Sequence, residues 1–186
     1  MSHRLRIGVL GTGHLGRIHL RCLQSLTVQW DLVGFFDPDH DAQKAVANLA
    51  SEEHWGMSPT AFDSADTLFA AVDAIAIVTP TADHARMAEA ALCAGCHVFI
   101  EKPVTTTLAE SERLIQARDA AGKIVQVGHV ERFNPAFQAA QQQLDRPQFI
   151  EAHRLAQFNP RGLDVPVVLD LMIHDIDLAL HALEGE

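Results

Sequence analysis

Basic residues are scarce in this sequence of 186 residues. Lysine and arginine number 14 against 24 acidic residues, so the formal net charge is −10. A chain this acidic repels a phosphate backbone, which argues against nucleic acid as a general partner. No apolar run reaches the ~20 residues of a membrane-spanning helix, and the first residues lack a signal-peptide pattern. We therefore expect a globular cytoplasmic protein with no membrane partner.

Several chemistry-bearing patterns are also missing. The three cysteines, Cys22, Cys93 and Cys96, are an odd number without metal-site partners, which suits a reducing compartment. The P-loop pattern is absent, because Gly122-Lys123 is followed by isoleucine, and no G-x-S-x-G elbow occurs. Metal-dependent and P-loop functions are thus disfavoured.

Apolar runs that alternate with helical patterns dominate residues 1–128. Runs without polar alternation are typical of strands covered on both faces, and repeated strand–helix–strand units favour parallel pairing. The sequence predicts a doubly wound α/β domain, of the Rossmann type, over residues 1–128. The expected strands are Leu5–Leu10, Leu32–Phe36, Asp73–Val78, His97–Ile100 and Ile124–Val127.

The expected helices lie between these strands. The first carries one apolar face, formed by Leu15, Ile18, Cys22, Leu23 and Leu26. The others are Ala42–Ala50, a helix capped by Asp63, Asp83–Ala94 with Gly95 behind it, and a helix from the Thr107/Glu110 capping box to Gly122.

The alternation of apolar runs and helical patterns ends after Gly128. Asn134-Pro135 starts a helix that is expected to reach Leu144, Phe149–Leu155 reads as a strand, and Val167–Leu183 is strongly apolar and helical in pattern. A single strand has no sheet to join. We therefore expect residues 129–186 to begin an α+β domain that is incomplete in this chain.

A glycine-rich turn follows the first expected strand. It reads Gly11-Thr12-Gly13-His14-Leu15-Gly16. The strand before it and the amphipathic helix after it are the context that dinucleotide binding requires. Gly11 allows the tight turn, Gly13 lets the backbone approach a pyrophosphate, and Gly16 allows close helix–strand packing. The alternative is a turn with a structural role alone.

Asp37 stands 21 positions after Gly16, at the end of the second expected strand. A carboxylate there can bind the 2′-OH of the adenosine ribose. Alternatively, Asp37-Pro38-Asp39 caps the next helix. The two roles are compatible if Asp39 caps the helix while Asp37 binds the ribose. No arginine follows Asp37 to accept a 2′-phosphate, so NAD is favoured over NADP.

Two further groups could carry chemistry. Lys102, in Glu101-Lys102-Pro103, follows an expected strand at the sheet edge where α/β domains bind ligands, and is either a hydroxyl-polarising group or a solvated surface charge. A polar stripe interrupts the last apolar segment at Asp170, His174, Asp177 and His181. Its Asp170/His174 pair could ligate a metal, form a buried ion pair, or supply a histidine base oriented by an aspartate.

These residues together resemble the Gfo/Idh/MocA family of nicotinamide-dependent oxidoreductases, named after glucose–fructose oxidoreductase and inositol dehydrogenase. The matching stretches occur in the family's order along nearly the whole chain. They are Gly8 to Gly16, Thr79-Pro80-Thr81 with His84, Glu101-Lys102-Pro103, Gly128 to Pro135, and Asp170 to Asp177. One departure is Thr81, which stands where the family commonly has asparagine.

The resemblance implies roles for individual residues. Lys102 would assist catalysis near the nicotinamide, while Asp170 and His174 would contact the substrate, with His174 as the acid or base. The cofactor site would also include Thr79, Pro80, His84 and Glu101, in addition to the glycine-rich turn and Asp37.

The resemblance also implies a substrate class and an assembly. Family substrates are mostly sugars, polyols and their derivatives, and two of the matching stretches look most like members that act on nucleotide sugars. Family members continue well past residue 186 into a domain for substrate binding and oligomerisation, so a homo-oligomer is expected at full length. Three hypotheses remain: an NAD-dependent dehydrogenase, a dinucleotide-binding or regulatory module without catalysis, or a purely structural fragment that binds no dinucleotide.

Overall fold

The computed structural model describes residues 4–184 apart from 57, 142, 145–146 and 156–164. The chain divides into two compact units, Met1–Val127 and Gly128–Glu186.

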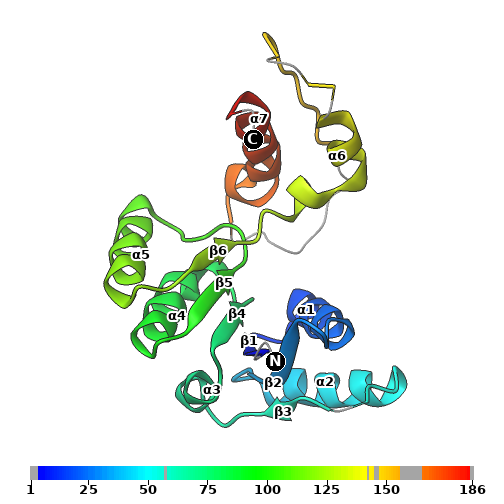
Figure 1. Cartoon of the computed structure of the whole chain (residues 1–186), viewed down its shortest axis with the longest axis vertical. Helices are drawn as coiled ribbons and strands as arrows, with labels where there is room; N and C mark the ends of the chain where they lie inside the picture. Colours follow the sequence, from blue (N-terminus) through cyan, green and yellow to red (C-terminus); the bar gives the residue numbers. More distant parts are fainter. Residues whose placement is uncertain (1–3, 57, 142, 145–146, 156–164, 185–186) are drawn as a thin grey trace. The chain divides into compact units, whose positions relative to one another are not determined.

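The first unit is built on a six-stranded sheet with the strand order β3-β2-β1-β4-β5-β6 (Figure 1). Every neighbouring pair of strands is parallel. This arrangement confirms the doubly wound α/β class predicted from the alternation of apolar runs and helices. The strands are β1 (Leu5–Leu10), β2 (Trp30–Phe36), β3 (Thr60–Ala61), β4 (Ala74–Ile77), β5 (His97–Ile100) and β6 (Val125–Val127).

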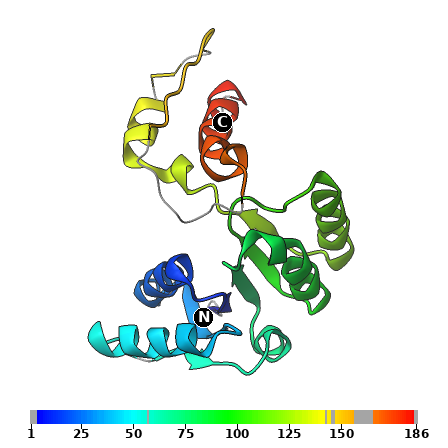
Figure 2. The same ribbon diagram turned by 180° about the vertical axis from the view of Figure 1, so that it is seen from behind.

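Five helices connect the strands and cover both faces of the sheet. From β1 the chain moves outward to β3, returns to β4 beside β1, and continues in the opposite direction to β6. Because such crossovers are right-handed, the helices before and after the return lie on opposite faces, as Figures 1 and 2 show. One face carries α1 (His14–Ser25) and α2 (His40–Glu52); the other carries α3 (Ala65–Ala71), α4 (Thr81–Cys93) and α5 (Leu108–Ala121).

Strand β4 contributes to a core on each face. Ile75 and Ile77 pack in the cluster that contains Leu92 of α4, whereas Ala74 and Ala76 belong to the cluster with Leu20 of α1. Successive side chains of a strand point to opposite faces, so this central strand is buried on both sides. Its continuous apolar run in the sequence has this cause.

The helix boundaries follow local capping chemistry. The Thr107/Glu110 capping box opens α5, and Gly122 closes it in the left-handed conformation at φ 61°, as predicted. The predicted cap of α3 was wrong. Ser64 rather than Asp63 caps this helix, because the Ser64 hydroxyl accepts from the Thr67 N–H while the Thr67 hydroxyl accepts from the Ser64 N–H.

The apolar face expected on α1 is only partly buried. The buried residues of the helix are Gly16, Leu20 and Leu23, whereas Leu15 and Ile18 are exposed. The close approach of α1 to the sheet at Gly16 decides which side of the helix turns inward. Leu23 and its neighbours on α1 border an apolar groove of about 510 Å³ over β1, β4, β5 and β6.

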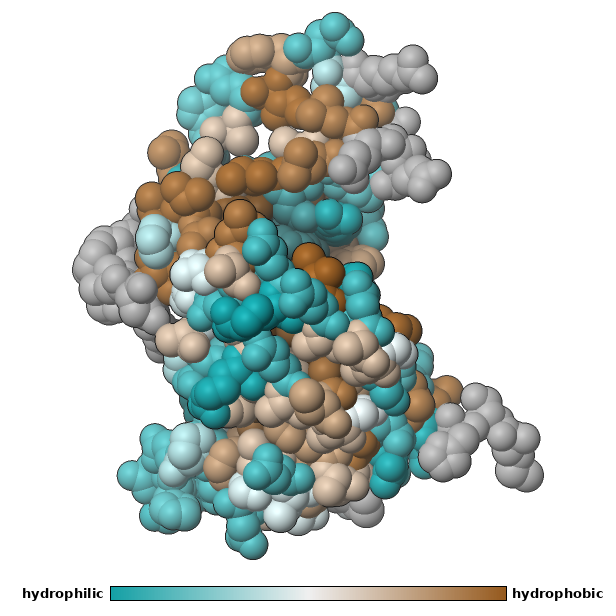
Figure 3. Space-filling view, turned by 90° about the vertical axis from the view of Figure 1, so that its left-hand side faces the viewer, coloured by the Kyte–Doolittle hydropathy of each residue, from teal (hydrophilic) through white to brown (hydrophobic). Residues whose placement is uncertain are grey.

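The second unit contains short helices. A 3-10 helix spans Val130–Phe133, followed by α6 (Pro135–Gln141); a π-helical turn, Val168–Met172, leads into α7 (Ile173–Glu184). Figure 3 shows large brown areas of hydrophobic side chains on this unit, where Phe149 and Leu155 are 80% and 93% exposed. None of the helices in the described residues is long and apolar enough to span a membrane.

The strand predicted at Phe149–Leu155 was wrong, since these residues have no regular structure. Phe149 and Ile150 are residue types that favour a strand, but a strand exists only when a neighbour completes its hydrogen-bond ladder. The described residues of the second unit contain no other strand to act as that neighbour. The predicted helix at Asn134-Pro135 does form but ends at Gln141 instead of reaching Leu144, and Asn134 caps it by accepting from the Ala136 N–H at 3.0 Å.

Candidate functional site

The candidate residues of the first unit follow the carboxyl ends of four adjacent strands. Gly11 comes directly after β1, Asp37 after β2, Thr79 two residues after β4, and Glu101 directly after β5. All of these strands are parallel, so their ends lie along one edge of the sheet (Figure 1). The strand order reverses between β1 and β4, and ligands of doubly wound sheets bind beside such a switch point.

The glycine-rich turn has the shape that a pyrophosphate requires. Gly11 has φ +90°, and a Cβ on Gly16 would lie 2.0 Å from the Gly11 carbonyl oxygen, so side chains are excluded at both positions. A Cβ on Gly13, in contrast, would meet nothing within 4 Å. Gly13 is also the N-cap of α1, and as a glycine it has no side chain that could accept from the first N–H groups of the helix. These N–H groups can therefore bind a phosphate, which fits a dinucleotide.

The remaining residues of this turn divide between core and surface. Thr12 is completely buried, whereas His14 and Leu15 are exposed in the first turn of α1. The Thr12 hydroxyl donates to Asp37 Oδ2 at 3.1 Å, and its backbone N–H donates to the same oxygen at 2.6 Å. Thr12 therefore joins the turn after β1 to the end of β2.

Asp37 and Asp39 perform different structural tasks. Asp37 Oδ1 accepts from the Asp39 N–H at 2.9 Å, while Asp39 caps α2 by accepting from the Asp41 N–H at 2.8 Å. The capping role predicted for Asp39 is thus confirmed. Each carboxylate oxygen of Asp37 can accept more than one hydrogen bond, so its ribose contact is chemically feasible and stays a prediction.

The end of β4 presents an unusual polar atom. The Thr79 hydroxyl oxygen is buried and has no hydrogen-bond partner among the described residues. A buried hydroxyl without a partner is costly, which is typical of a position that a ligand completes. Pro80 is exposed and caps α4, whereas His84, inside α4, is only 1% exposed.

The segment after β5 is held through several contacts. The Glu101 N–H donates to the Ile77 carbonyl at 3.1 Å, which continues the β4–β5 pairing. Glu101 and Pro103 are buried while Lys102 between them is half-buried, and the Lys102–Pro103 peptide bond is cis. Lys102 thus stands at the sheet edge, as the motif predicts.

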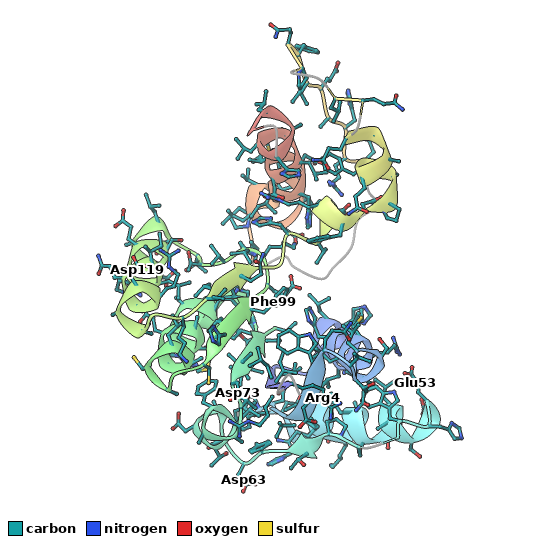
Figure 4. All side chains as sticks on the ribbon, in the orientation of Figure 1. Arg4, Glu53, Asp63, Asp73, Phe99 and Asp119 are labelled. Carbon is teal, nitrogen blue, oxygen red and sulfur yellow. The ribbon has the colours of Figure 1, made fainter. Side chains whose placement is uncertain are left out.

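Sequence reasoning missed His19 as a partner of this segment. His19 Nε2 lies 2.8 Å from Glu101 Oε1, although 82 positions separate the two residues. The available signal was its position three residues after Gly16, on the same side of α1 as the glycine that approaches the sheet. Phe99 of β5, labelled in Figure 4, packs against its ring with a centroid separation of 5.4 Å.

The polar stripe of the second unit spans two kinds of helix. Asp170 lies in the π-helical turn, while His174 lies at the start of α7, and both side chains are half-buried. A π-turn is often found at functional sites. No cluster of three metal-ligating side chains exists in the described part of the chain.

The other two members of the stripe have partners within this unit. The buried Asp177 carboxylate accepts from Arg132 Nε at 2.7 Å and Nη2 at 2.6 Å, and His129 Nδ1 lies 3.6 Å from it. These contacts hold the pKa of Asp177 below its usual range, chiefly through the Arg132 hydrogen bonds. His181 Nε2 lies 2.9 Å from the Gln141 amide nitrogen. Sequence reasoning did not assign a role to Arg132, although it lies in the stretch Gly128 to Pro135.

The fold and this edge of the sheet define a dinucleotide-binding α/β protein of the Rossmann class. Residues 5–129 match the family model described as "Oxidoreductase family, NAD-binding Rossmann fold". The chain belongs to this oxidoreductase family, whose cofactor is NAD, and the resemblance to the Gfo/Idh/MocA family is thereby confirmed.

Individual relatives support the same assignment. The chain is 43% identical over 177 residues to UDP-N-acetylglucosamine 3-dehydrogenase of Acidithiobacillus ferrooxidans, which covers 95% of this chain and 53% of that protein. It is 31% identical over 195 residues to scyllo-inositol 2-dehydrogenase (NAD(+)) of Bacillus subtilis, covering 100% of this chain and 56% of that protein. A solved structure of the Acidithiobacillus enzyme, named GnnA, has a TM-score of 0.84 at 41% identity, covering 97% of this chain and 57% of that one. This chain therefore spans about half the length of these relatives.

Proposed function

We propose that this chain is the NAD-binding part of a dehydrogenase that oxidises a secondary hydroxyl of a sugar, polyol or nucleotide sugar. One observation carries the proposal. The open Gly13 position, the Asp37 carboxylate and Lys102 follow strands of one parallel sheet and lie along the same edge. That edge combines a site that can bind a dinucleotide with the ammonium group of Lys102, which can stabilise negative charge on the oxygen of an alcohol.

Each part of this edge has a task in binding the cofactor. The first N–H groups of α1 bind the pyrophosphate, Asp37 accepts from the adenosine ribose, and the Thr79 hydroxyl gains its missing partner at the nicotinamide half. Glu101, Pro80 and His84 belong to the same region of the sheet edge. Bound NAD supplies an electrophilic carbon that accepts a hydride.

The alcohol loses one proton and one hydride as it becomes a carbonyl group. In this proposal the Lys102 ammonium stabilises the negative charge that develops on the hydroxyl oxygen. The resemblance to the family assigns the hydroxyl proton to His174 and the orientation of its imidazole to Asp170, and both roles in the second unit stay predictions. The C–H bond then breaks, and its electron pair leaves with the hydrogen.

A nucleotide sugar is the substrate that the relatives favour. The relative with 43% identity is named for UDP-N-acetylglucosamine, whereas the inositol dehydrogenase is 31% identical. The difference in identity supports a UDP-linked amino sugar ahead of a free polyol.

Binding measurements on the purified chain test the proposal. Calorimetric titration should show saturable NAD binding, and UDP-N-acetylglucosamine should raise the melting temperature further in the presence of NAD. Stabilisation by scyllo-inositol instead would assign a polyol, and NAD binding without any sugar effect would favour a binding module without catalysis. A chain that binds neither NAD nor NADP would overturn the proposal.

A further inference from the structure

Two histidines hold the short segment that carries Lys102. We propose that His19 and His84 are positioning residues that fix Lys102 at the carboxyl end of β5, an inference that rests on the proposed role of Lys102 at the hydroxyl. Neither histidine has to touch the substrate for this. Each contacts a residue next to Lys102 in the chain, one on either side.

His19 acts on the residue before Lys102. Its Nε2 lies 2.8 Å from Glu101 Oε1, and the other carboxylate oxygen, Oε2, accepts from the Lys102 backbone N–H at 3.1 Å. The Glu101 side chain is 8% exposed and that of His19 is 19% exposed. The carboxylate therefore bridges α1 and the Lys102 backbone in a site with little water to compete.

The environment of the His19 ring restricts its movement. Phe99, two residues before Glu101 on the same stretch of chain, packs against the imidazole at a centroid distance of 5.4 Å. The ring of His19 thus has an apolar neighbour on β5 and a polar partner just beyond the end of β5. This combination fixes the direction from which it meets Glu101.

His84 acts on the residue after Lys102. Its Nδ1 lies 2.8 Å from the Pro103 carbonyl oxygen and its Nε2 lies 2.9 Å from the Thr79 carbonyl oxygen. Carbonyl oxygens only accept, so each contact is a hydrogen bond when that ring nitrogen carries a hydrogen. The completely buried ring links the end of β4 to the chain just after Lys102.

Such contacts matter because lysine has a long side chain with many rotamers. Holding the backbone on both sides of Lys102 removes part of the conformational freedom that would otherwise be lost in the transition state. Supporting contacts of this kind commonly decide how well a functional side chain is placed. A structural role alone would stabilise the domain without affecting Lys102.

The chain offers a direct probe of Lys102. It contains three lysines, Lys44, Lys102 and Lys123. Protein labelled with ¹³C at the lysine ε-carbon therefore gives three side-chain signals, and the spectrum of Lys102→Arg identifies the one from Lys102. Spectra recorded with and without NAD report its environment without requiring turnover, while Lys44 and Lys123 serve as internal references.

Three variants separate positioning from general stability. His19→Leu removes the contact with Glu101, whereas His19→Gln places an amide nitrogen near the former Nε2. His97→Gln is the matched control, because His97 stands at the other end of β5 and accepts from the Ile124 N–H at 3.1 Å. We expect His19→Leu to shift and broaden the Lys102 signal alone, His19→Gln to restore it largely, and His97→Gln to leave it unchanged.

NAD titrations complete the test. NAD should change the chemical shift of the Lys102 signal in the wild type, and His19→Leu should reduce that change. The same variant should weaken NAD binding by less than about tenfold, the range of one hydrogen bond. His84→Asn, which can keep the Pro103 contact and lose the Thr79 contact, should also broaden the Lys102 signal.

The outcomes distinguish the two proposals. If the Lys102 signal of His19→Leu matches the wild type with and without NAD, the positioning role is wrong, whatever happens to His84→Asn. If NAD does not move the Lys102 signal of the wild type, the proposed function of Lys102 is wrong. The response of the NAD-free signal to His19→Leu still tests positioning in that case.

Discussion

Asp37 accepts two hydrogen bonds from Thr12, one from the backbone N–H at 2.6 Å and one from the hydroxyl at 3.1 Å. The carboxylate that follows β2 is therefore fixed by the turn that follows β1. In this position it can select between a ribose hydroxyl and a ribose phosphate, because a negative carboxylate accepts from the former and repels the latter.

Asp37 should determine the preference for NAD over NADP. Asp37→Ala is expected to weaken NAD binding about tenfold or more, the range of a hydrogen bond to a charged group. It should also reduce the difference in affinity between NAD and NADP. Asp37→Asn is the matched control, since it keeps an acceptor for Thr12 but removes the charge. Calorimetric titrations with both dinucleotides measure the effect. Wild-type protein that binds NADP as tightly as NAD would contradict the prediction.

The glycines of the turn should respond differently to substitution. Gly13→Val should abolish NAD binding yet leave folding intact, because a side chain at this position points into open space where the pyrophosphate is expected. Gly16→Ala should instead destabilise the domain, because its Cβ would lie 2.0 Å from the Gly11 carbonyl oxygen. Thermal unfolding and NAD titration of both variants test the contrast, which fails if Gly13→Val binds normally.

Lys102 should affect turnover far more than cofactor affinity. If its charge stabilises the oxygen only as the proton departs, Lys102→Ala should lower turnover by about 10²–10⁴-fold with little change in the NAD dissociation constant. Steady-state rates with a reactive sugar substrate, together with NAD titration, provide both values. Unchanged turnover would make Lys102 an ordinary surface lysine.

Asp177 should make the second unit sensitive to acid. Its folded-state pKa is lowered, chiefly by Arg132, so its stabilising contribution is complete above the ordinary aspartate value of about 3.9 and is lost as the pH falls through the lowered pKa. Arg132→Ala should destabilise α7 by about 1–3 kcal/mol near neutral pH, because it leaves a buried charge without its main partner. Hydrogen exchange of α7 amides measures this loss.

Arg154→Ala serves as the control for that experiment. Arg154 pairs with Asp175 at 2.8 Å, and the Asp175 side chain is 22% exposed, against 9% for that of Asp177. Exposed ion pairs contribute about 0–1 kcal/mol, so its effect on exchange should be smaller. Equal effects of the two variants would show that burial of Asp177 is unimportant.

Hydrogen exchange should also separate the sheet from the irregular segment. Amides of Ile75–Ile77 should exchange slowly, because they belong to a central strand buried on both faces. Amides of 149–155 should exchange rapidly in the isolated chain, since Phe149 and Leu155 are exposed and no strand forms there. A monodisperse monomer with slow exchange throughout 149–155 would contradict this expectation.

Much of the first unit could be predicted from the sequence, because the relevant forces are local or periodic. His97–Ile100 has the predicted strand boundaries, and the Thr107/Glu110 box begins α5 as expected. The spacing from Gly16 to Asp37 predicts a dinucleotide motif, and the glycine-rich turn and Asp37 do follow the adjacent strands β1 and β2. Continuous apolar runs indicated a sheet covered on both faces, since burial on two sides removes the need for polar alternation.

Other features required the tertiary structure, because they depend on which distant groups meet. The sequence by itself determined the strand–helix alternation and the glycine-rich turn, and it predicted roles for Lys102 and His174 that stay predictions. Only the fold decided that His19 reaches Glu101, that Arg132 pairs with Asp177, and that Leu15 and Ile18 of α1 face outward. The strand expected at 149–155 failed for the same physical reason: local propensity favours a conformation, but a strand forms only where another strand shares its hydrogen bonds.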